Sequence, residues 1–457
     1  MLTLAEATVQ TETFFAELRR REFARLERRQ QAYLDYTGSG LYPERLVRAH
    51  FERLRDGVFG NPHSAHDPSL ASTAIIEEAR ASVRAFLDAD PADYAVVFTA
   101  NASAAIKLVA ESYPFTSAGA YVLSADNHNA VNGVREFARR AGARVTYLPL
   151  DEELRMPGVD QALDAAARLG TGPRLFAYSA QSNFSGVKHP LDLVERARGL
   201  GYDVLLDAAA YVPANRLSLR AVPADFVAVS FYKVFGYPTG VGALVARHDA
   251  LARLRRPWFA GGTVDFVSVQ NDMHQLRAGP ERFEDGTPDF LSVAGIAPGL
   301  AFMREIDIDR LSAHVRVLTS EMLHGLQSLA HGNGAPVVVI YGPRTMDARG
   351  GTVAFNLLDA AGRPIPYGIV ERRAREAGVS VRGGCFCNPG AGEWAFGFAA
   401  TDAARCMRDT AQGFTLERFA QCMGPDVAVG ALRASVGMAS NADDVRRCVA
   451  VMQEFAE

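Results

Sequence analysis

The chain has 457 residues, of which 48% are hydrophobic and 22% charged, and its formal net charge is -4. This length predicts two or three domains with a large core, and the charge balance excludes a strongly basic protein of the kind that binds nucleic acid. No apolar run approaches the ~18 residues of a membrane span, and the N-terminal residues lack the apolar stretch of a signal peptide.

Short apolar strands alternate with helical patterns through the first two thirds of the chain. This alternation predicts an α/β fold with a mostly parallel sheet that is covered on both faces. A charge-rich helix is expected first, at 11–31. The strands are expected at 95–99, 121–124, 145–150, 175–178, 204–207 and 226–231, with an added edge strand at 240–246, and helices at 100–110, 131–141 and 191–200.

The pattern changes near residue 298. A long helix is expected at 299–329, followed by strands at 337–341, 352–357 and 380–382 and by helices at 369–377 and 443–455. We interpret this part as a second, smaller α+β domain. The predicted boundaries are 30–298 for the large domain and 299–457, together with the segment 1–29, for the small domain.

Lysine is scarce, which narrows the search for amine chemistry. Only Lys107, Lys188 and Lys233 are lysines among the 48 Lys and Arg residues. Lys107 fits a solvated helix face, and Lys188 a surface loop. Lys233 lies in the apolar run VAVSFYKVFG, where burial would lower its pKa, as a Schiff-base lysine requires. A purely structural lysine is the alternative at this stage.

Three polar positions follow predicted strands, where ligands of open α/β sheets collect. Asp207 ends a strand and precedes three alanines, so it is either a partner for a ring nitrogen or an ordinary helix cap. The turn FTANAS, 98–103, joins a strand to a helix and is a weak candidate for an anion site. His128 follows another strand end and is either stacked on a ligand or without a role.

Two cysteines lie in the loop RGGCFCNPG, 382–390. The spacing of Cys385 and Cys387 is poor for zinc, and we expect no metal site. Flanking glycines favour an accessible, mobile loop, in which the nearby Arg382 would help to form a thiolate. The other cysteines, Cys406, Cys422 and Cys448, are expected in the core. Five cysteines, an odd number, argue against a disulfide scaffold and lead us to expect a reducing, cytoplasmic compartment.

Taken together and in order, these motifs resemble the class V aminotransferase superfamily of fold-type I pyridoxal phosphate (PLP) enzymes. Within it, the chain is most similar to the cysteine desulfurase-like domain of molybdenum-cofactor sulfurases. The resemblance runs from about residue 30 to the end. From it we expect these 457 residues to contain no counterpart of the C-terminal domain that handles the molybdenum cofactor in full-length sulfurases. The matching segments are YLDYTGSGLYPERL (33–46), GNPHS (60–64), FTANASAAIKLVAE (98–111), DNHNAV (126–131), AQSNFSGVKHPL (180–191), VLLDAAAYVP (204–213), PADFVAVSFYKVFGYPTGVGALV (223–245), FEDGTPDF (283–290), RGGCFCNPGA (382–391) and LRASVGMASNADDV (432–445).

The resemblance implies a fold-type I transferase with a seven-stranded type of sheet, and it implies roles for single residues. Lys233 would bind the cofactor covalently, Asp207 would pair with its ring nitrogen, His128 would stack on the ring, and Asn183 would reach the ring hydroxyl. The phosphate would be held by Ala102, Ser103, Ser230 and Tyr232, with Thr287 from a neighbouring subunit of a homodimer.

The remaining implied roles concern the substrate. Arg433 would bind the substrate carboxylate, with Arg382 nearby, and Cys387 stands where the family carries its persulfide. Two positions depart from the pattern: Ala210 replaces a glutamine that is common in desulfurases, and Gly392 replaces a cysteine typical of the sulfurases.

The function expected from the resemblance is desulfuration of L-cysteine to L-alanine, with the sulfur held as a persulfide on Cys387 and passed to a possible protein acceptor. The same residues would also support a C–S lyase, an aminotransferase or an epimerase that acts on another amino acid. A non-catalytic sulfur-relay protein is a third reading. We expect no nucleic acid or membrane partner.

Overall fold

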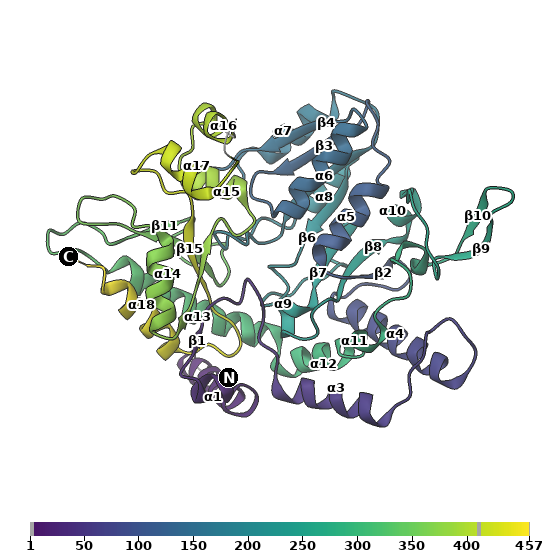
Figure 1. The fold of residues 1–457 in the computed structure, drawn as a ribbon, viewed down its shortest axis with the longest axis horizontal. Coiled ribbons are helices and arrows are strands. Elements are labelled where there is room, and N and C mark those ends of the chain that lie inside the picture. The colour runs from purple at the N-terminus through teal and green to yellow at the C-terminus, as the bar shows by residue number, and fades with distance from the viewer. Residues whose placement is uncertain (1–3, 409–412, 457) are drawn as a thin grey trace.

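The computed structural model describes residues 4–408 and 413–456. Its centre is a seven-stranded sheet with the order β2-β8-β7-β6-β5-β3-β4 (Figure 1). The α/β class and the mostly parallel sheet predicted from the sequence are confirmed. The strands are β2 Tyr94–Thr99, β3 Ala120–Ser124, β4 Arg144–Leu148, β5 Arg174–Ser179, β6 Asp203–Asp207, β7 Phe226–Ser230 and β8 Gly242–Arg247.

Strand β8 is the exception in this sheet. It was expected at an edge, but it lies between β2 and β7 and is antiparallel to both. Every residue of β8 except Arg247 is buried, because it has a neighbour on each side. The expectation failed because the short connection from β7 to β8 suggests a hairpin but says nothing about a third strand from far upstream.

Both faces of the sheet are covered, as the near-continuous apolar strands require. Along β2, Val96 and Phe98 belong to one buried cluster, whereas Ala95 and Val97 belong to another. One cluster includes side chains of the helices α5 and α6, and the other includes those of α4, α8, α12 and α13. The bounds of these helices are α4 Asp67–Phe86, α5 Ala102–Ser112, α6 Asn129–Arg140, α8 Leu193–Gly199, α12 Ile296–Ile306 and α13 Ile308–Gln327.

A second sheet of four antiparallel strands is built from the C-terminal part of the chain, in the order β11-β12-β15-β14. Helices α13, α14 and α18 contact this sheet or one another. Its elements are β11 Val338–Tyr341, β12 Thr352–Leu357, β14 Arg382–Gly384, β15 Ala431–Ser435, α14 Tyr367–Glu376 and α18 Ala442–Gln453. The predicted domain boundaries stay a prediction, and residues 1–3, 409–412 and 457 lie outside the description.

Two expected helices are interrupted. The pattern over 299–329 forms α12 and α13, which are separated at Asp307, where φ is 67°. The Asp307 side chain accepts a hydrogen bond from the Asp309 amide at 3.0 Å and so starts the second helix. The pattern over 11–31 forms α1 Leu4–Glu22 and the short α2 Arg25–Arg28.

Several elements were not predicted. The hairpin of β9 and β10 projects from one end of the molecule (Figure 1). These elements are β1 Ala32–Tyr33, α3 Glu44–Asp56, α7 Val159–Ala167, α9 Phe231–Phe235, α10 His248–Arg253, β9 Val264–Ser268, β10 Met273–Leu276, the 3-10 turn Pro280–Phe283, α11 Phe290–Val293 and α15 Pro389–Ala395. The strand expected at 380–382 is divided between β13 Val379–Ser380 and β14, and the helical patterns around Cys406 and Cys422 form α16 Ala400–Arg408 and α17 Leu416–Met423. Among the described residues, no helix has the length and apolar character that would let it cross a membrane.

The cysteine expectation is only partly correct. Cys448 is buried in the core, as expected. Cys406 and Cys422 are not separate core thiols, because they form a disulfide between α16 and α17. Sequence spacing could not reveal this pair, since it depends on how two short helices meet.

Candidate active site

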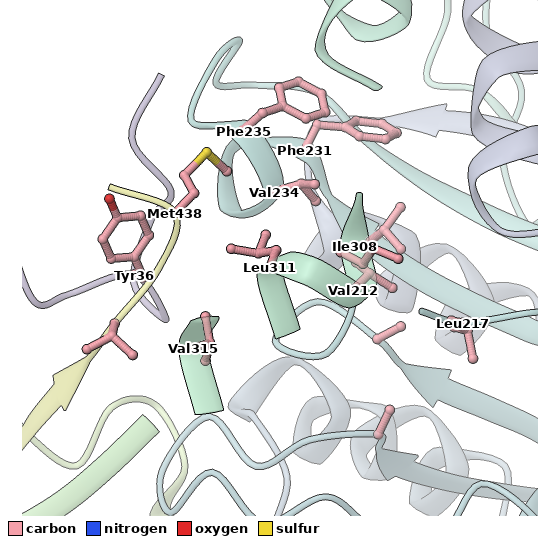
Figure 2. Packing of buried hydrophobic residues seen from close by; sticks show 14 of the residues in the cluster. Tyr36, Val212, Leu217, Phe231, Val234, Phe235, Ile308, Leu311, Val315 and Met438 are labelled. Atoms are coloured by element: carbon pink, nitrogen blue, oxygen red, sulfur yellow. The ribbon is translucent and has the colours of Figure 1, made fainter. Parts of the chain in front are cut away.

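The short helix α9 fixes the position of Lys233. Phe231, Val234 and Phe235 are spaced as one helical face, and all three are buried (Figure 2). Helix α9 packs on α12, where a Cβ atom at Gly299 would lie 2.4 Å from the Phe235 ring. Lys233 lies between Phe231 and Val234 in sequence, so its side chain is on the opposite face of α9. Gly40 lies directly behind the helix, where a Cβ atom would come within 2.9 Å of the Lys233 carbonyl oxygen.

Lys233 opens into a cavity of about 100 Å³ at the carboxyl ends of the central strands. Most of the residues that the sequence assigned to a cofactor line it, but their individual roles stay predictions. The cavity is lined by Asn101, Ala102, Ser103, Ile106, His128, Ser179, Gln181, Asn183, Asp207, Ala209, Ala210, Ser230, Tyr232 and Lys233.

Burial sets the electrostatics of this cavity. It lowers the pKa of Lys233, while the Asp207 carboxylate opposes that shift. Burial also lowers the pKa of His128, again against Asp207. His128 Nδ1 accepts the Ala130 amide hydrogen at 3.1 Å, so a neutral ring carries its proton on Nε2. The site therefore combines a buried carboxylate with an amine and an imidazole that burial biases toward their neutral forms.

One end of the cavity is the start of α5. Asn101 caps the helix by accepting the Ala104 amide at 3.0 Å, and the Ala102 amide donates to Ser230 Oγ at 2.8 Å. Within the described residues, no hydrogen bond is made by the amide or the hydroxyl of Ser103. This helix start can come close to β8 because a Cβ atom at Gly242 would lie 2.5 Å from Asn101 Cα. Such an arrangement suits an anion.

The loop that carries Cys387 is exposed, as expected, but it is held in place. Phe386 and Cys387 both have positive φ angles, 55° and 57°. Asn183 Nδ2 donates to the Phe386 carbonyl at 2.6 Å, and the Asn129 amide donates to the Cys387 carbonyl at 2.7 Å. The expected accessibility of Cys387 is therefore present, whereas the mobility of the loop stays a prediction; in the structure, hydrogen bonds hold the carbonyls of Phe386 and Cys387.

The buried side chain of Asn388 holds the same loop through hydrogen bonds. It is fully buried, and its Nδ2 donates to Asp126 Oδ1 at 2.6 Å and to Asn183 Oδ1 at 3.0 Å. Asp126 is itself held by Ser182 and, at 2.9 Å, by His189 Nε2. This buried network connects the cavity wall at Asn183 to the loop of Cys387.

Two arginines share one carboxylate near the loop. Arg433 Nη2 donates to Asp35 Oδ1 at 2.9 Å, and Arg382 donates to the same carboxylate through Nε and through Nη2, the latter at 2.6 Å. Arg433 also donates to the Asn183 carbonyl at 2.8 Å. Its buried Nε has no partner within the described residues. Because two cations face one carboxylate, the cluster keeps a net positive charge.

Four predicted residues do not line the cavity. Cys387, Arg382 and Arg433 lie close enough to Lys233 that their charges affect its pKa, so they border the same site. Thr287 does not line the cavity of its own chain. It is exposed, and its hydroxyl accepts a hydrogen bond from Asn61 Nδ2 at 3.4 Å.

The comparisons with known proteins identify the family. The family model described as Aminotransferase class-V matches residues 32–448. This chain belongs to the class V aminotransferase family. The family is PLP-dependent, which agrees with a cavity that brings a lysine, an aspartate and a helix start together.

The curated relatives include molybdenum cofactor sulfurases. That of Arabidopsis thaliana is 37% identical over 413 residues, which is 82% of this chain and 50% of the relative. That of Drosophila erecta is 34% identical, over 94% of this chain and 59% of the relative. The chain thus spans about half the length of the curated relatives it matches.

Solved structures support the same fold. A cysteine desulfurase from Thermococcus onnurineus has a TM-score of 0.79 at 24% identity and is covered over 98% of its length by 96% of this chain. A cysteine desulfurase from Escherichia coli has a TM-score of 0.74 at 22% identity, with the same coverage of both chains. The predicted fold type is therefore confirmed.

Sequence reasoning missed several residues of the site. Gln181 lines the cavity, Asp35 holds both arginines, and Asn388 anchors the loop. Each lies in a segment that carried the family resemblance. The resemblance pointed to these segments, but only the contacts separate a residue that shapes the site from its neighbours.

Proposed function

We propose that this chain binds PLP and desulfurates L-cysteine to L-alanine, with the sulfur received by Cys387. The observation that carries the proposal is the position of an exposed thiol beside the cavity of Lys233. Cys387 lies close enough for its thiolate charge to favour the protonated forms of Lys233 and Arg433. An aminotransferase or an epimerase has no need of such a thiol.

The residues that line the cavity fit the cofactor. Lys233 supplies the amine, Asp207 a carboxylate for a protonated ring nitrogen, and Ala209 with Ala210 leave room for a flat ring. The amide and hydroxyl of Ser103, at the start of α5, would bind the phosphate together with the hydroxyl of Ser230. Asn183 Oδ1 and Nδ2 already have partners in the loop, so a contact with the ring hydroxyl would add to that network.

The protein side chains then divide the remaining work. When bound, PLP withdraws electrons from the substrate Cα. Lys233, whose pKa is lowered by burial, moves a proton at that carbon. Arg433 holds the substrate carboxylate through the donors that Asp35 and Asn183 leave free. The Cys387 thiolate attacks the substrate sulfur, and the Cβ–S bond breaks with its electron pair passing to the Cβ side. Protonation at that carbon completes the alanine skeleton, and the sulfur remains on Cys387 as a persulfide.

The test is incubation of the pure protein with PLP, L-cysteine and a reducing thiol, followed by assays of alanine and sulfide. We expect both products from the wild type and neither from Cys387→Ser, whereas the matched control Cys448→Ser keeps both. Pyruvate and ammonia formed equally by all three proteins would show β-elimination and refute desulfuration. Borohydride reduction should leave the cofactor on a peptide containing Lys233.

We also propose a homodimer with shared sites, in which Thr287 serves the cavity of the partner copy. Support comes from large apolar side chains that are exposed in the single chain, Trp258 and those of the β9–β10 hairpin, including Phe266 and Met273. Mixing Lys233→Ala and Thr287→Asp proteins should restore part of the activity, because one site of the mixed dimer is then intact. A monomer in analytical ultracentrifugation would contradict this.

The sulfur acceptor of this chain is a separate proposal. The curated relatives are named for the molybdenum cofactor, and this chain matches about half of their length. We propose a protein or small-molecule acceptor that approaches the exposed face of Cys387. Transfer of labelled sulfur from the isolated persulfide to a candidate acceptor would identify it.

A further inference from the structure

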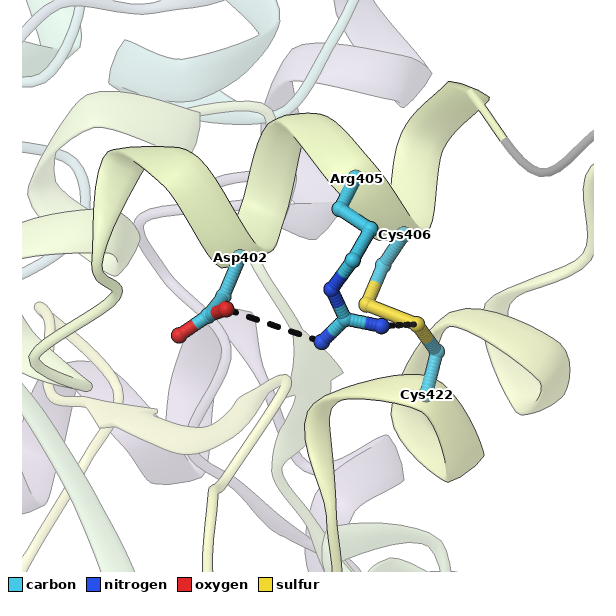
Figure 3. The surroundings of a disulfide bond; sticks show 4 residues. All are labelled: Asp402, Arg405, Cys406 and Cys422. Atoms are coloured by element: carbon cyan, nitrogen blue, oxygen red, sulfur yellow. Dashed lines mark hydrogen bonds and ion pairs between the residues drawn. A yellow bond between two sulfur atoms is a disulfide. The ribbon is translucent and has the colours of Figure 1, made fainter.

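The disulfide between Cys406 and Cys422 lies outside the cavity and has no part in the proposed reaction. It joins α16 to α17, with the two Cα atoms 5.7 Å apart (Figure 3). Cys406 is buried, whereas Cys422 is half-buried and therefore open to a small molecule. We call the two helices and their disulfide the α16–α17 clasp.

A cation stands at the accessible sulfur. Arg405 Nη1 lies 3.3 Å from Cys422 Sγ, and Arg405 Nη2 lies 3.6 Å from the Asp402 carboxylate, which orients the guanidinium (Figure 3). Thiol–disulfide exchange passes through a state in which negative charge is shared by three sulfurs. A guanidinium at the attacked sulfur stabilises that charge and attracts an anionic thiol.

The clasp supports the part of the chain that carries Cys387. Phe419 of α17 begins a row of ring contacts that leads to Phe386, which directly precedes Cys387 in the chain. The centroid distances along this row lie between 5.3 and 6.0 Å. In order, the rings are Phe419, Phe398, Phe396, Phe184 and Phe386.

Helix α17 also forms one wall of a groove of about 460 Å³. Ala420 and Gln421, which precede Cys422, lie on this wall, and Val429 is also part of the lining. The Val429 carbonyl accepts a hydrogen bond from Cys385 Sγ at 3.2 Å. The α16–α17 clasp is thus connected to the loop of Cys385 and Cys387 in two ways. One is the row of ring contacts, and the other is the groove that α17 and Val429 line together.

From these contacts we infer that Cys406–Cys422 is a redox site for small anionic thiols, and that its reduction loosens the loop of Cys387. A thiolate attacks Cys422 Sγ, the protein S–S bond breaks, and Cys406 leaves as a thiolate that takes a proton from water. A second thiolate attacks the sulfur of the bound thiol, Cys422 leaves beside Arg405, and the two small thiols depart as their disulfide. Two electrons pass from the thiols to the protein, and the small disulfide reverses the reaction.

The first experiment measures the rate of reduction by differential alkylation and mass spectrometry of the full chain. Glutathione, a net anion, and cysteamine, a cation, are compared. In Arg405→Gln, the rate with glutathione relative to cysteamine should fall about two- to five-fold, the effect of one exposed ion pair. Arg405→Lys should keep the wild-type ratio. Because each protein is compared with itself, a general change in stability cancels.

The second experiment measures hydrogen–deuterium exchange in the oxidised and the reduced protein. Reduction should speed exchange in α16, in α17 and in the peptide that contains residues 384–388. Cys422→Ser is the control, and in it the reductant should change none of these rates. These readouts do not require turnover of cysteine, so they separate this inference from the proposed function.

Three results would overturn the inference. Both cysteines could be alkylated without reductant even after treatment with oxidised glutathione, which would mean that no disulfide forms. The ratio of the two thiols could be unaffected by Arg405→Gln, which would remove the role of the cation. Exchange at residues 384–388 could be equal in both redox states, which would leave the clasp without influence on the Cys387 loop.

Discussion

Arg433 and Asp35 form a buried ion pair, with Nη2 of the arginine 2.9 Å from Oδ1 of the aspartate. The aspartate follows β1 near the start of the chain, and the arginine lies on β15 near its end. Asp35 also pairs its backbone with Ser435 in a parallel bridge, two residues beyond Arg433. The N-terminal segment therefore sets the orientation of the residue proposed to hold the substrate.

We expect Asp35→Asn to lower the free energy of unfolding by about 3 kcal/mol, because it leaves a buried guanidinium without its counter-charge. It should also raise the KM for L-cysteine more than it lowers kcat, since Arg433 loses its fixed direction. Urea unfolding and steady-state kinetics measure these two effects. The matched control is Asp56→Asn, which breaks an exposed ion pair with Arg55 and should shift neither. An unchanged KM would remove Asp35 from the positioning role.

The lowered pKa of Lys233 predicts a pH dependence of stability. Between its folded pKa and its unfolded value of 10.5, the unfolded chain binds a proton that the folded chain does not. The contribution of Lys233 to the free energy of unfolding therefore rises with pH between these two pKa values. Below the folded pKa, the contribution no longer changes with pH and remains unfavourable. Lys233→Met should make the cofactor-free protein more stable than the wild type at pH 7, and the difference should shrink at pH 10. The exposed Lys107 provides the control, and Lys107→Met should show no such convergence in urea unfolding.

The lowered pKa of His314 predicts a loss of folding stability at acidic pH. Burial lowers its pKa to about 4, while its Nε2 donates to the Ser440 carbonyl at 2.9 Å and its ring stacks on Phe15. As the pH falls from 6.5 to about 4, the unfolded chain takes up a proton that the folded chain resists, so stability falls. The loss is at most about 3 kcal/mol for this shift.

His314→Phe should remove that acid-dependent loss while costing about 1 kcal/mol at neutral pH through the lost hydrogen bond. Comparing urea midpoints at pH 7.5 and pH 5 measures both effects. His324→Gln, at an exposed position of the same helix, should keep the wild-type pH dependence. A variant His314→Phe with the full acid sensitivity of the wild type would show that other groups cause it.

Asn388 offers a prediction about the loop. Asn388→Ala should lower the free energy of unfolding by about 1–3 kcal/mol, because Asp126 loses a buried donor. The rate of desulfuration should fall while PLP still binds, since the change displaces Cys387 without touching Lys233. PLP absorbance and alanine release, measured on the same sample, test this. Loss of PLP binding in step with activity would point to a general collapse of the site instead.

Much of the central sheet could be predicted from the sequence, because buried parallel strands are short apolar runs with helices between them. The position of β8 could not, since Gly242–Arg247 pairs with Tyr94–Thr99 from far upstream. The break at Asp307 was also missed, because the apolar pattern continues on both sides of a single residue with positive φ.

In the candidate site, too, some residues could be predicted from the sequence and others could not. Lys233 and Asp207 stand out locally, because a charged side chain inside an apolar run needs a reason to be there. Asp35 and Asn388 do not stand out, since an aspartate or an asparagine in a turn is ordinary. Their importance comes from arginine and amide partners hundreds of residues away, and no local pattern records such distances.

The peptide link between His128 and Asn129 has a consequence for how a sulfur acceptor would meet this protein. His128 lines the cavity, and the next amide holds the carbonyl of Cys387. If a cofactor ring stacks on His128, as the resemblance implies, any shift of His128 would be passed to the Asn129 amide and so to the Cys387 carbonyl. We expect the conformation of the exposed Cys387 loop to differ between the protein with and without bound cofactor. A sulfur acceptor that contacts only this loop would then bind the two forms with different affinity.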